Sequence, residues 1–241
     1  MATTNPEPKK IVLIAGGTGG LGRAVTLEFL RSGATVVVTY LRPAEFDQLK
    51  SEAGPDAASL EGQQTDVTNL GAAKELVAAI VARLGRLDAM VNTVGGYAGG
   101  VALWETDPRI FERMLDLNLR SGFALSRAAV PIMLKQKSGS IVNVAAKAAV
   151  DHAAGAAAYA ASKAGAVAMM DCLAADLKGT GVRVNSVLPS IIDTEANRKA
   201  MPGSDFSKWP KPGEIARIIT FLCSDAATLI HGAAIPVYGG S

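Results

Sequence analysis

Tyr159 and Lys163, in the segment "YAASK", form a pair that could do acid–base chemistry. The two residues are four apart, so on a helix they lie on one face about one turn from each other. A tyrosine hydroxyl titrates near pH ~10, and a neighbouring ammonium favours its ionised form and lowers its pKa. The pair predicts a general acid or base, Tyr159, whose pKa is lowered by Lys163. The alternative is an ordinary Tyr/Lys pair on a solvated helix face.

A glycine-rich segment near the N-terminus could hold a phosphate group. It follows the apolar run at 11–15, precedes a helical pattern, and satisfies G-x-G-x-x-G through Gly17, Gly19 and Gly22. Glycine lets a diphosphate approach the backbone closely, and the N-terminus of the next helix offers free N–H groups. A P-loop is excluded because no Lys-Ser/Thr follows the last glycine. The segment therefore predicts a dinucleotide site, with a purely structural turn as the alternative.

The end of the second predicted strand bears on which dinucleotide would bind. A carboxylate there would accept a hydrogen bond from the ribose 2′-hydroxyl and repel a 2′-phosphate. The strand ends at Tyr40 without a carboxylate, and Arg42 could pair with a phosphate. NADP(H) is therefore favoured and NAD(H) is the alternative. Arg23 is a second candidate contact for the phosphate. Asp47 stands too far along the chain to serve as the missing carboxylate. The alternative for Arg42 is that it simply faces solvent at a helix start and does not bind the cofactor.

Strands and helices alternate along the chain, as expected for βαβ units with a parallel sheet covered on both faces. Apolar runs predict strands at 11–15, 35–40, 87–92, 140–144, 182–187 and 234–237, with a weaker one at 59–65. Helical patterns cover about 20–32, 43–53, 69–84, 107–135, 157–178 and 212–224. The sequence predicts an α/β fold.

No break in composition divides the 241 residues into two domains. We expect a flexible N-terminus at 1–9 and a single dinucleotide-binding catalytic domain at 10–241. The segment 190–212 mixes Pro, Gly and aromatic residues, which suits a lid over a site.

Composition excludes several classes of protein. The hydrophobic fraction of 49% supports a large core, and a net charge of +2 without a dense basic stripe argues against nucleic acid. No apolar stretch approaches the roughly 18 residues of a membrane span. The two cysteines, Cys172 and Cys223, lack metal-ligand spacing, so we expect no metal site and a reduced, cytoplasmic protein.

The chain resembles the short-chain dehydrogenase/reductase family. The glycine segment also fits the variant A/T-G-x-x-x-G-x-G, through Ala15, Gly16, Gly20 and Gly22. Further segments resemble the family in the same order: "TDV" at 65–67, "VNTVGG" at 91–96, "DLNL" at 116–119, "YAASK" at 159–163, "VNSVLPSIIDT" at 184–194 and "HGAAIPVYGG" at 231–240.

This resemblance implies a Rossmann-type, doubly wound parallel sheet of about seven strands and an NAD(P)(H)-dependent oxidoreductase acting on a small C=O or C=N substrate. It implies a homodimer or homotetramer, and adds Asn118 to the catalytic residues, as the group that helps seat a water relay behind Lys163. The cofactor-binding residues that it implies, together with those inferred above, are Gly16, Thr18, Gly19, Gly20, Leu21, Gly22, Tyr40, Arg42, Asp66, Val67, Asn92, Val94, Gly95, Tyr159, Lys163, Pro189, Ile192 and Thr194.

One residue departs from the family's pattern. Family members carry a serine thirteen positions before the tyrosine, and this chain has Ala146 there. The loss of a hydroxyl donor costs several kcal/mol where a developing oxyanion depends on it, so reduction of ordinary ketones is in doubt. Lys147, His152 or Thr93 could substitute for the serine.

Two short segments suggest a different substrate. "AAKAAVD" at 145–151 and "GGYAGG" at 95–100 resemble dihydropteridine reductase, a family member that also lacks the serine and reduces a quinonoid pterin. A further alternative is a catalytically weak NAD(P)-binding sensor. The residues expected near the substrate, each equally suited to packing, are Ala146, Lys147, Tyr97, His152, Trp104 and Trp209.

Overall fold

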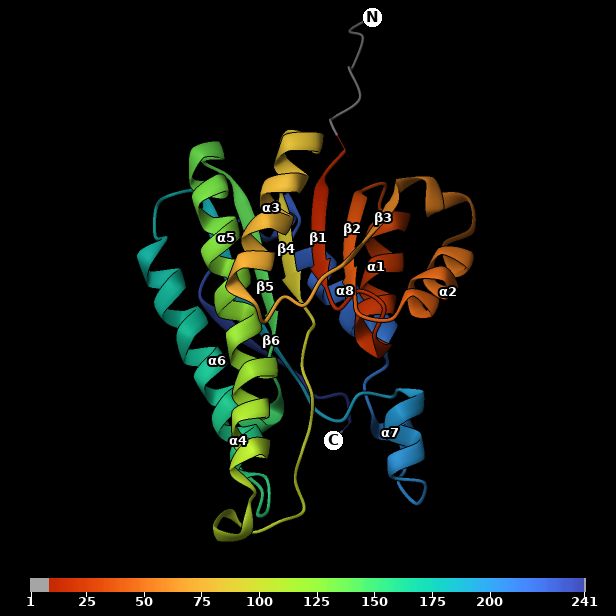
Figure 1. Ribbon diagram of the computed structural model, residues 1–241, viewed down its shortest axis with the longest axis vertical. Helices are drawn as coiled ribbons and strands as arrows, with labels where there is room; N and C mark the ends of the chain where they lie inside the picture. Colours follow the sequence, from red (N-terminus) through yellow and green to blue (C-terminus); the bar gives the residue numbers. More distant parts are fainter. Residues whose placement is uncertain (1–8, 241) are drawn as a thin grey trace, which may run out of the picture.

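The computed structural model describes residues 9–240, and the predicted flexible N-terminus lies outside them except for Lys9. The described part contains one parallel sheet of seven strands in the order β3-β2-β1-β4-β5-β6-β7 (Figure 1). The strands are β1 (Ile11–Ala15), β2 (Thr35–Tyr40), β3 (Leu60–Gln64), β4 (Ala89–Asn92), β5 (Gly139–Val144), β6 (Val182–Pro189) and β7 (Ala233–Val237). The order reverses between β1 and β4, which makes the sheet doubly wound and Rossmann-type, as predicted.

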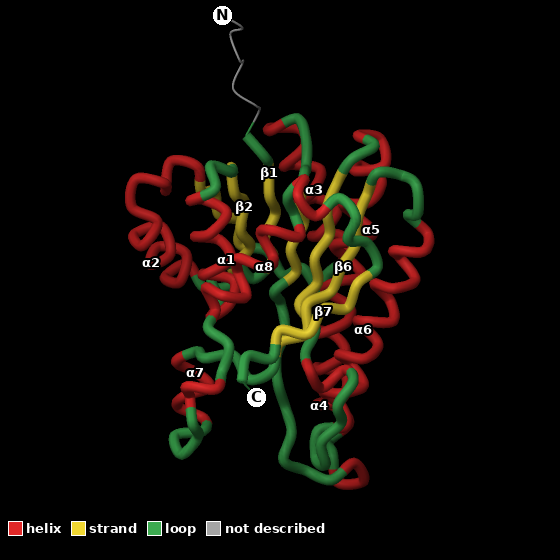
Figure 2. The backbone as a smooth tube through the Cα atoms, turned by 180° about the vertical axis from the view of Figure 1, so that it is seen from behind, coloured by secondary structure: helices red, strands yellow, loops and turns green. Residues whose placement is uncertain are grey.

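Helices cover both faces of the sheet, because the side chains of each buried strand alternate between two cores. Val12 and Ile14 of β1 belong to a core that includes side chains of α1 and α8, while Leu13 belongs to a second core with α3, α5 and α6. Figure 2 shows the molecule from behind. The helices are α1 (Gly20–Arg31), α2 (Pro43–Ala53), α3 (Leu70–Leu84), α4 (Pro108–Leu115), α5 (Ser121–Gln136), α6 (Ala157–Asp176), α7 (Glu195–Ala200) and α8 (Pro212–Leu222).

The helix expected at 107–135 is interrupted, so that prediction is wrong in its middle. Asp116–Arg120 forms a π-helical turn between α4 and α5. The widened turn contains Asn118, which is buried and directs its amide toward α6 and the β4–α4 loop. Apolar periodicity alone could not reveal the interruption, since the same residues also fit a continuous helix. Such turns occur often at functional sites.

The segment expected as a lid has a small core of its own. Asp193 pairs with Arg198, whose guanidinium lies 4.9 Å from the ring centroid of Phe206. Phe206 in turn packs on Trp209, with ring centroids 4.9 Å apart. Figure 1 shows α7 of this segment beyond the end of the sheet, across from α4.

Among residues 9–240, no helix is both long enough and apolar enough to cross a bilayer. The same residues contain no group of three or more His, Cys, Asp or Glu side chains that could hold a metal ion.

Candidate active site

The glycine loop joins β1 to α1 in a tight turn that depends on missing side chains. Gly16 has a φ of +73°, which disfavours other residues. A Cβ atom on Gly22 would overlap the carbonyl oxygen of Gly16, and one on Gly17 would lie 2.5 Å from Val38 on β2. Gly19 differs, because a Cβ atom there would make only an ordinary contact at 3.4 Å. Three glycines are therefore required by the turn itself, and Gly19 is not.

The loop leaves an open cradle at the N-terminus of α1. Gly19 and Gly20 are exposed, and Gly19 caps the helix without any side chain. Amide groups in the first turn of a helix have no partners within the helix, and the positive end of the helix dipole attracts anions. No acidic residue stands in that first turn. These residues fit the diphosphate of a dinucleotide.

Thr194, from the segment after β6, lies against this cradle. A Cβ atom on Gly20 would be 2.9 Å from the Cγ2 atom of Thr194. The Thr194 hydroxyl caps α7 by accepting a hydrogen bond from the Asn197 amide. Pro189 ends β6, and Ile192 packs on the core shared with α1. The structure thus places Thr194 against the glycine loop and Ile192 on the core that α1 shares.

Asn92, at the end of β4, orients the loop that follows it. It is 1% exposed, and its Nδ2 donates to Ser121 Oγ at 3.2 Å and to Asn143 Oδ1 at 3.0 Å. Its Oδ1 accepts a hydrogen bond from the Val94 amide at 3.2 Å. Both polar atoms of the Asn92 side chain are hydrogen-bonded within the protein, so Asn92 acts by holding the loop after β4 in place.

Asn118 and Lys163 both lie close to Gly95, in the same loop after β4. The Asn118 amide exchanges two hydrogen bonds with the backbone of Gly96, both at 3.0 Å, and donates a third to Ser162 Oγ. Lys163 is 5% exposed, and its ammonium donates to the Val144 carbonyl oxygen at 3.0 Å. A Cβ atom on Gly95 would lie 2.8 Å from Asn118 Oδ1 and 3.1 Å from Lys163 Nζ. Glycine at position 95 therefore leaves room for the side-chain oxygen of Asn118 and the ammonium of Lys163.

Burial decides the ionisation of both members of the Tyr159–Lys163 pair. Burial raises the pKa of Tyr159 to about 12, and the nearby phenol of Tyr97 adds to the increase. Burial lowers the pKa of Lys163 to about 8. The lowered tyrosine pKa expected from the sequence is therefore wrong for this structure. The cost of ionising a half-buried phenol dominates, and the ammonium is bound to the Val144 carbonyl.

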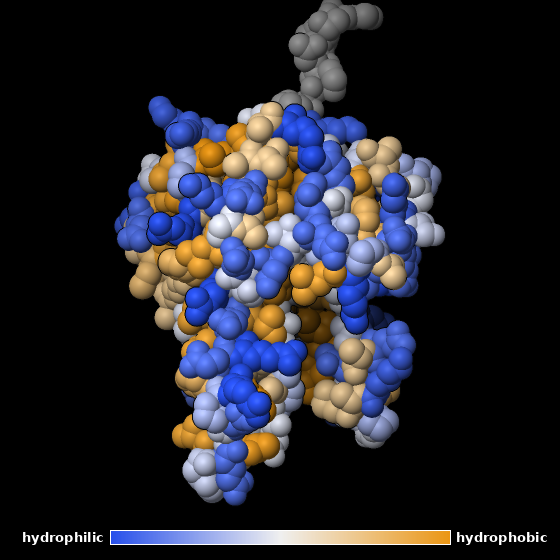
Figure 3. Space-filling view, viewed as in Figure 1, coloured by the Kyte–Doolittle hydropathy of each residue, from blue (hydrophilic) through white to orange (hydrophobic). Residues whose placement is uncertain are grey.

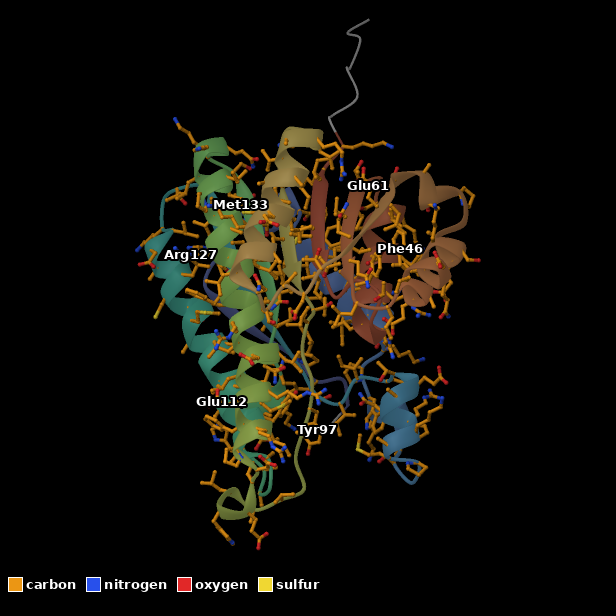
Figure 4. All side chains as sticks on the ribbon, viewed as in Figure 1. Phe46, Glu61, Tyr97, Glu112, Arg127 and Met133 are labelled. Carbon is orange, nitrogen blue, oxygen red and sulfur yellow. The ribbon has the colours of Figure 1, made fainter. Side chains whose placement is uncertain are left out.

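Tyr97 is the predicted substrate-pocket residue that the structure brings to Tyr159. Their rings meet edge to face, with centroids 5.0 Å apart and planes at 76°. Tyr97 is 67% exposed, and its hydroxyl fills the space that a Cβ atom on Gly99 would need. Figure 4 shows Tyr97 on the segment after β4, in the region between α4 and α7. Figure 3 shows the surface hollowed there, with apolar residues inside the hollow.

Ala146 is buried just after β5, and the side chains of Thr93 and Lys147 are each held by other partners. Thr93 Oγ1 donates to the Ala15 carbonyl oxygen at 2.7 Å, within the base of the glycine loop. Lys147 Nζ lies 3.6 Å from Asp151 and 5.2 Å from the ring centroid of Tyr238. The suggested substitution by either residue therefore finds no support in the geometry.

The other predicted substrate-pocket residues differ widely in exposure. Trp209 is 6% exposed and packs on Phe206. Trp104 is 86% exposed on the short turn Leu103–Glu105, and His152 is also exposed. The aromatic character of these residues predicts neither the burial of Trp209 nor the exposure of Trp104 and His152.

The end of β3 supplies two further predicted cofactor residues. Asp66 is exposed at this edge of the sheet, and its Oδ1 accepts hydrogen bonds from the Thr68 amide and hydroxyl at 2.9 and 2.8 Å. Val67 beside it is 2% exposed. Asp66 thus presents a fixed carboxylate to solvent next to the sheet, while Val67 contributes to the core.

A carboxylate that the sequence analysis missed lies at the end of β2. Glu45, in the first turn of α2, pairs with Arg42 and accepts a hydrogen bond from Thr18 Oγ1 at 3.3 Å. As predicted, β2 itself ends without a carboxylate. In the folded chain, however, the carboxylate of Glu45 lies beside Arg42. The sequence did contain a signal for this pair. Residues three apart at the start of a helix lie next to each other, so Glu45 is expected beside Arg42.

Comparisons with known proteins agree with this arrangement. A family model described as short chain dehydrogenase matches residues 10–205. A 3-oxoacyl-[acyl-carrier-protein] reductase of Thermotoga maritima is 33% identical over 239 residues, covering 96% of this chain and 97% of the relative. A D-threitol dehydrogenase of Mycolicibacterium smegmatis is 32% identical, covering 96% and 92%. The solved structure "ElxO with NADP Bound" has a TM-score of 0.91 at 27% identity, covering 97% of this chain and 98% of the other.

Proposed function

The chain belongs to the short-chain dehydrogenase family, and from this premise we propose that it is an NAD(P)(H)-dependent oxidoreductase acting on a small C=O or C=N substrate. One observation carries the proposal: Lys163 is buried one helical turn from Tyr159, with its ammonium beside Gly95 and Asn118. Burying a lysine is costly, and a structural helix gains nothing from it. Such costly groups concentrate at functional sites.

Tyr159 serves as the general acid for reduction. When bound, the nicotinamide supplies or accepts the hydride. With a pKa of about 12, the Tyr159 hydroxyl is protonated at neutral pH and can donate to a substrate oxygen or nitrogen. The Lys163 ammonium is anchored by the Val144 carbonyl and remains available to stabilise charge that develops on the phenol. Asn118 holds the Gly96 backbone and thereby keeps the neighbouring loop in place.

NADP(H) is the preferred cofactor in this proposal, with NAD(H) as the alternative. The Arg42 side chain is 79% exposed just after β2, and its partner Glu45 contacts Thr18 of the glycine loop. A guanidinium at this place can pair with the 2′-phosphate of a bound dinucleotide. The similar solved structure "ElxO with NADP Bound" supports this choice by analogy. Arg23 is a weaker candidate, because its side chain is only 27% exposed and its guanidinium binds two side chains, those of Glu52 and Gln48.

The second candidate function is reduction of a conjugated C=N system such as a quinonoid pterin. Ala146 offers no hydroxyl to a ketone oxygen, and Tyr97 places an exposed aromatic ring beside Tyr159. An aromatic side chain stacks on a planar, conjugated substrate better than on an aliphatic substrate. A sensor without turnover is less favoured, because sensing does not need a buried lysine beside a phenol.

We also propose that the enzyme is a cytoplasmic homodimer or homotetramer. The cytoplasmic part of the proposal rests on the likeness to the bacterial 3-oxoacyl-[acyl-carrier-protein] reductase. Apolar side chains are exposed on α4 and α5, and such surface suits contacts between subunits. They are Ile110, Phe111, Phe123 and Leu134.

The test follows NADPH and NADH oxidation with ketones, oxoacyl thioesters, quinones, imines and a quinonoid dihydropterin. We expect turnover of at least one class by the wild type, and its loss in Tyr159→Phe while calorimetry still detects dinucleotide binding. Unchanged turnover in Tyr159→Phe would remove the general-acid role. Ketone reduction as fast as in serine-containing relatives would overturn the argument from Ala146.

A further inference from the structure

Glu45 links the glycine loop to Arg42, the residue expected to bind the 2′-phosphate of a dinucleotide. One carboxylate oxygen accepts a hydrogen bond from Thr18 Oγ1 of the glycine loop at 3.3 Å, and the other pairs with Arg42. Thr18 is 5% exposed, while the Glu45 side chain is 29% exposed. A partly buried acid therefore stands between the glycine loop and the arginine expected to recognise a 2′-phosphate.

The packing of α2 holds Glu45 in this position. Pro43 occupies the start of the helix, which fixes where its first turn begins. Phe46, the next residue after Glu45, stacks on Tyr40 of β2 with ring centroids 5.0 Å apart and planes at 8°. Gly62 of β3 makes room for this ring, since a Cβ atom there would lie 2.5 Å from it. Figure 4 shows Phe46 between α2 and the sheet.

The two charges favour different dinucleotides. A carboxylate at the end of the second strand accepts a hydrogen bond from a ribose 2′-hydroxyl and repels a 2′-phosphate, whereas an arginine there pairs with the phosphate. In this chain the carboxylate also occupies the arginine. A 2′-phosphate must therefore compete with Glu45 for Arg42 and approach a like charge, while a 2′-hydroxyl meets neither cost.

We propose that Glu45 is a specificity-determining residue that restrains the preference for NADP(H) given by Arg42 and admits NAD(H). The inference rests on the proposed function, because it assumes that a dinucleotide occupies the glycine cradle. It assigns to Glu45 an effect on binding that the residues of β2 alone do not predict.

Calorimetry with NADP⁺ and NAD⁺ at low ionic strength tests the proposal on the full chain. We expect Glu45→Gln to strengthen NADP⁺ binding by up to about fivefold, as for the loss of one like charge at a partly exposed site. NAD⁺ binding should be unchanged or weaker, so the ratio of the two affinities rises. Glu28→Gln is the matched control: Glu28 pairs with Arg31 at the same spacing and similar exposure, but on α1. It should leave the ratio unchanged.

Three further variants, one of them a double variant, separate the sources of the effect. In Arg42→Ala the preference for NADP⁺ should fall, and adding Glu45→Gln should then have a smaller effect than in the wild type. Glu52→Gln removes the ion pair of Arg23, and a shift of the affinity ratio in that variant without one in Glu45→Gln would overturn the inference.

The remaining outcomes distinguish the inference from the proposed function. If the wild type binds both dinucleotides and folded Glu45→Gln keeps the same affinity ratio, the assignment to Glu45 is overturned and the proposed function stands. If the wild type binds neither dinucleotide, the proposed function itself is overturned. Thermal unfolding of each variant establishes that it is folded.

Discussion

The ring of Tyr97 meets that of Tyr159 edge to face, with centroids 5.0 Å apart and planes at 76°. This contact places a second phenol beside the proposed proton donor. Tyr97 comes from the loop after β4 and Tyr159 from α6, so the fold brings together two aromatic residues that are distant in sequence. The contact restrains the Tyr159 ring and helps raise its pKa.

The first prediction concerns the ionisation of Tyr159 in the chain without dinucleotide. Burial and Tyr97 raise its pKa from 10.0 to about 12, so its hydroxyl should ionise later than an ordinary tyrosine. Alkaline titration of tyrosinate absorbance, taken as wild type minus Tyr159→Phe, isolates this group. Tyr97→Phe should lower the Tyr159 pKa while leaving it above 10.0, because burial is the larger cause. Ionisation of Tyr159 below pH 10.0 in the wild type would contradict the structure.

The second prediction restores the missing hydroxyl. Ala146→Ser should raise kcat/KM for simple ketones by about tenfold or more, since a single oxyanion donor is worth about a hundredfold or more when perfectly placed. Steady-state kinetics with NADPH and a series of ketones measures the effect. Ala146 has an extended backbone, so its neighbour Ala145 points to the opposite side.

Ala145→Ser is therefore the matched control, as Ala145 is also buried at the end of β5. It adds the same hydroxyl and should not raise ketone turnover. An equal gain in both variants, or none in Ala146→Ser, would show that the serine position does not limit ketone reduction.

The sequence predicted the strands well because each buried strand is a short apolar run between glycine-rich or polar turns. Even the polar segment at 59–65 forms β3, as its place beside β2 compensates for its weak pattern. The dinucleotide cradle was predictable for a similar reason, since its glycines are local requirements of one turn. Contacts between distant segments were not predictable. Periodicity says nothing of the Tyr97–Tyr159 contact, and a search for acids within β2 overlooks Glu45.

The third prediction uses the buried ammonium of Lys163. Its pKa falls from 10.5 to about 8 on folding, so below pH 8 it is protonated in both states and its burial costs stability. Between pH 8 and 10.5 the unfolded chain binds more protons, and the unfolding free energy therefore rises with pH. Above 10.5 the amine is neutral in both states and this cost is gone.

Lys163→Met removes this titration. The unfolding free energy of the wild type minus that of Lys163→Met should rise by about 3 kcal/mol or less between neutral pH and about pH 10. Urea unfolding at fixed protein concentration across this range measures it. Tyr159 is present in both proteins, so its own titration largely cancels in the difference. A difference that stays flat with pH would show that Lys163 keeps an ordinary pKa in the folded chain.

The last prediction separates the two roles of the glycines in the cradle. Gly22→Ala should destabilise the fold by about 1–3 kcal/mol and abolish dinucleotide binding, because its Cβ atom would overlap the Gly16 carbonyl oxygen and so force the glycine loop to move. Gly19 has a φ of −71° and room for a Cβ atom, so Gly19→Ala should unfold at nearly the wild-type temperature. Gly19→Ala should nonetheless weaken NADP⁺ and NAD⁺ binding alike, since the added methyl group stands where a diphosphate must approach the exposed backbone. Thermal unfolding and calorimetry on the same samples measure both quantities. Wild-type affinity for both dinucleotides in Gly19→Ala would mean that the diphosphate is held elsewhere on the chain.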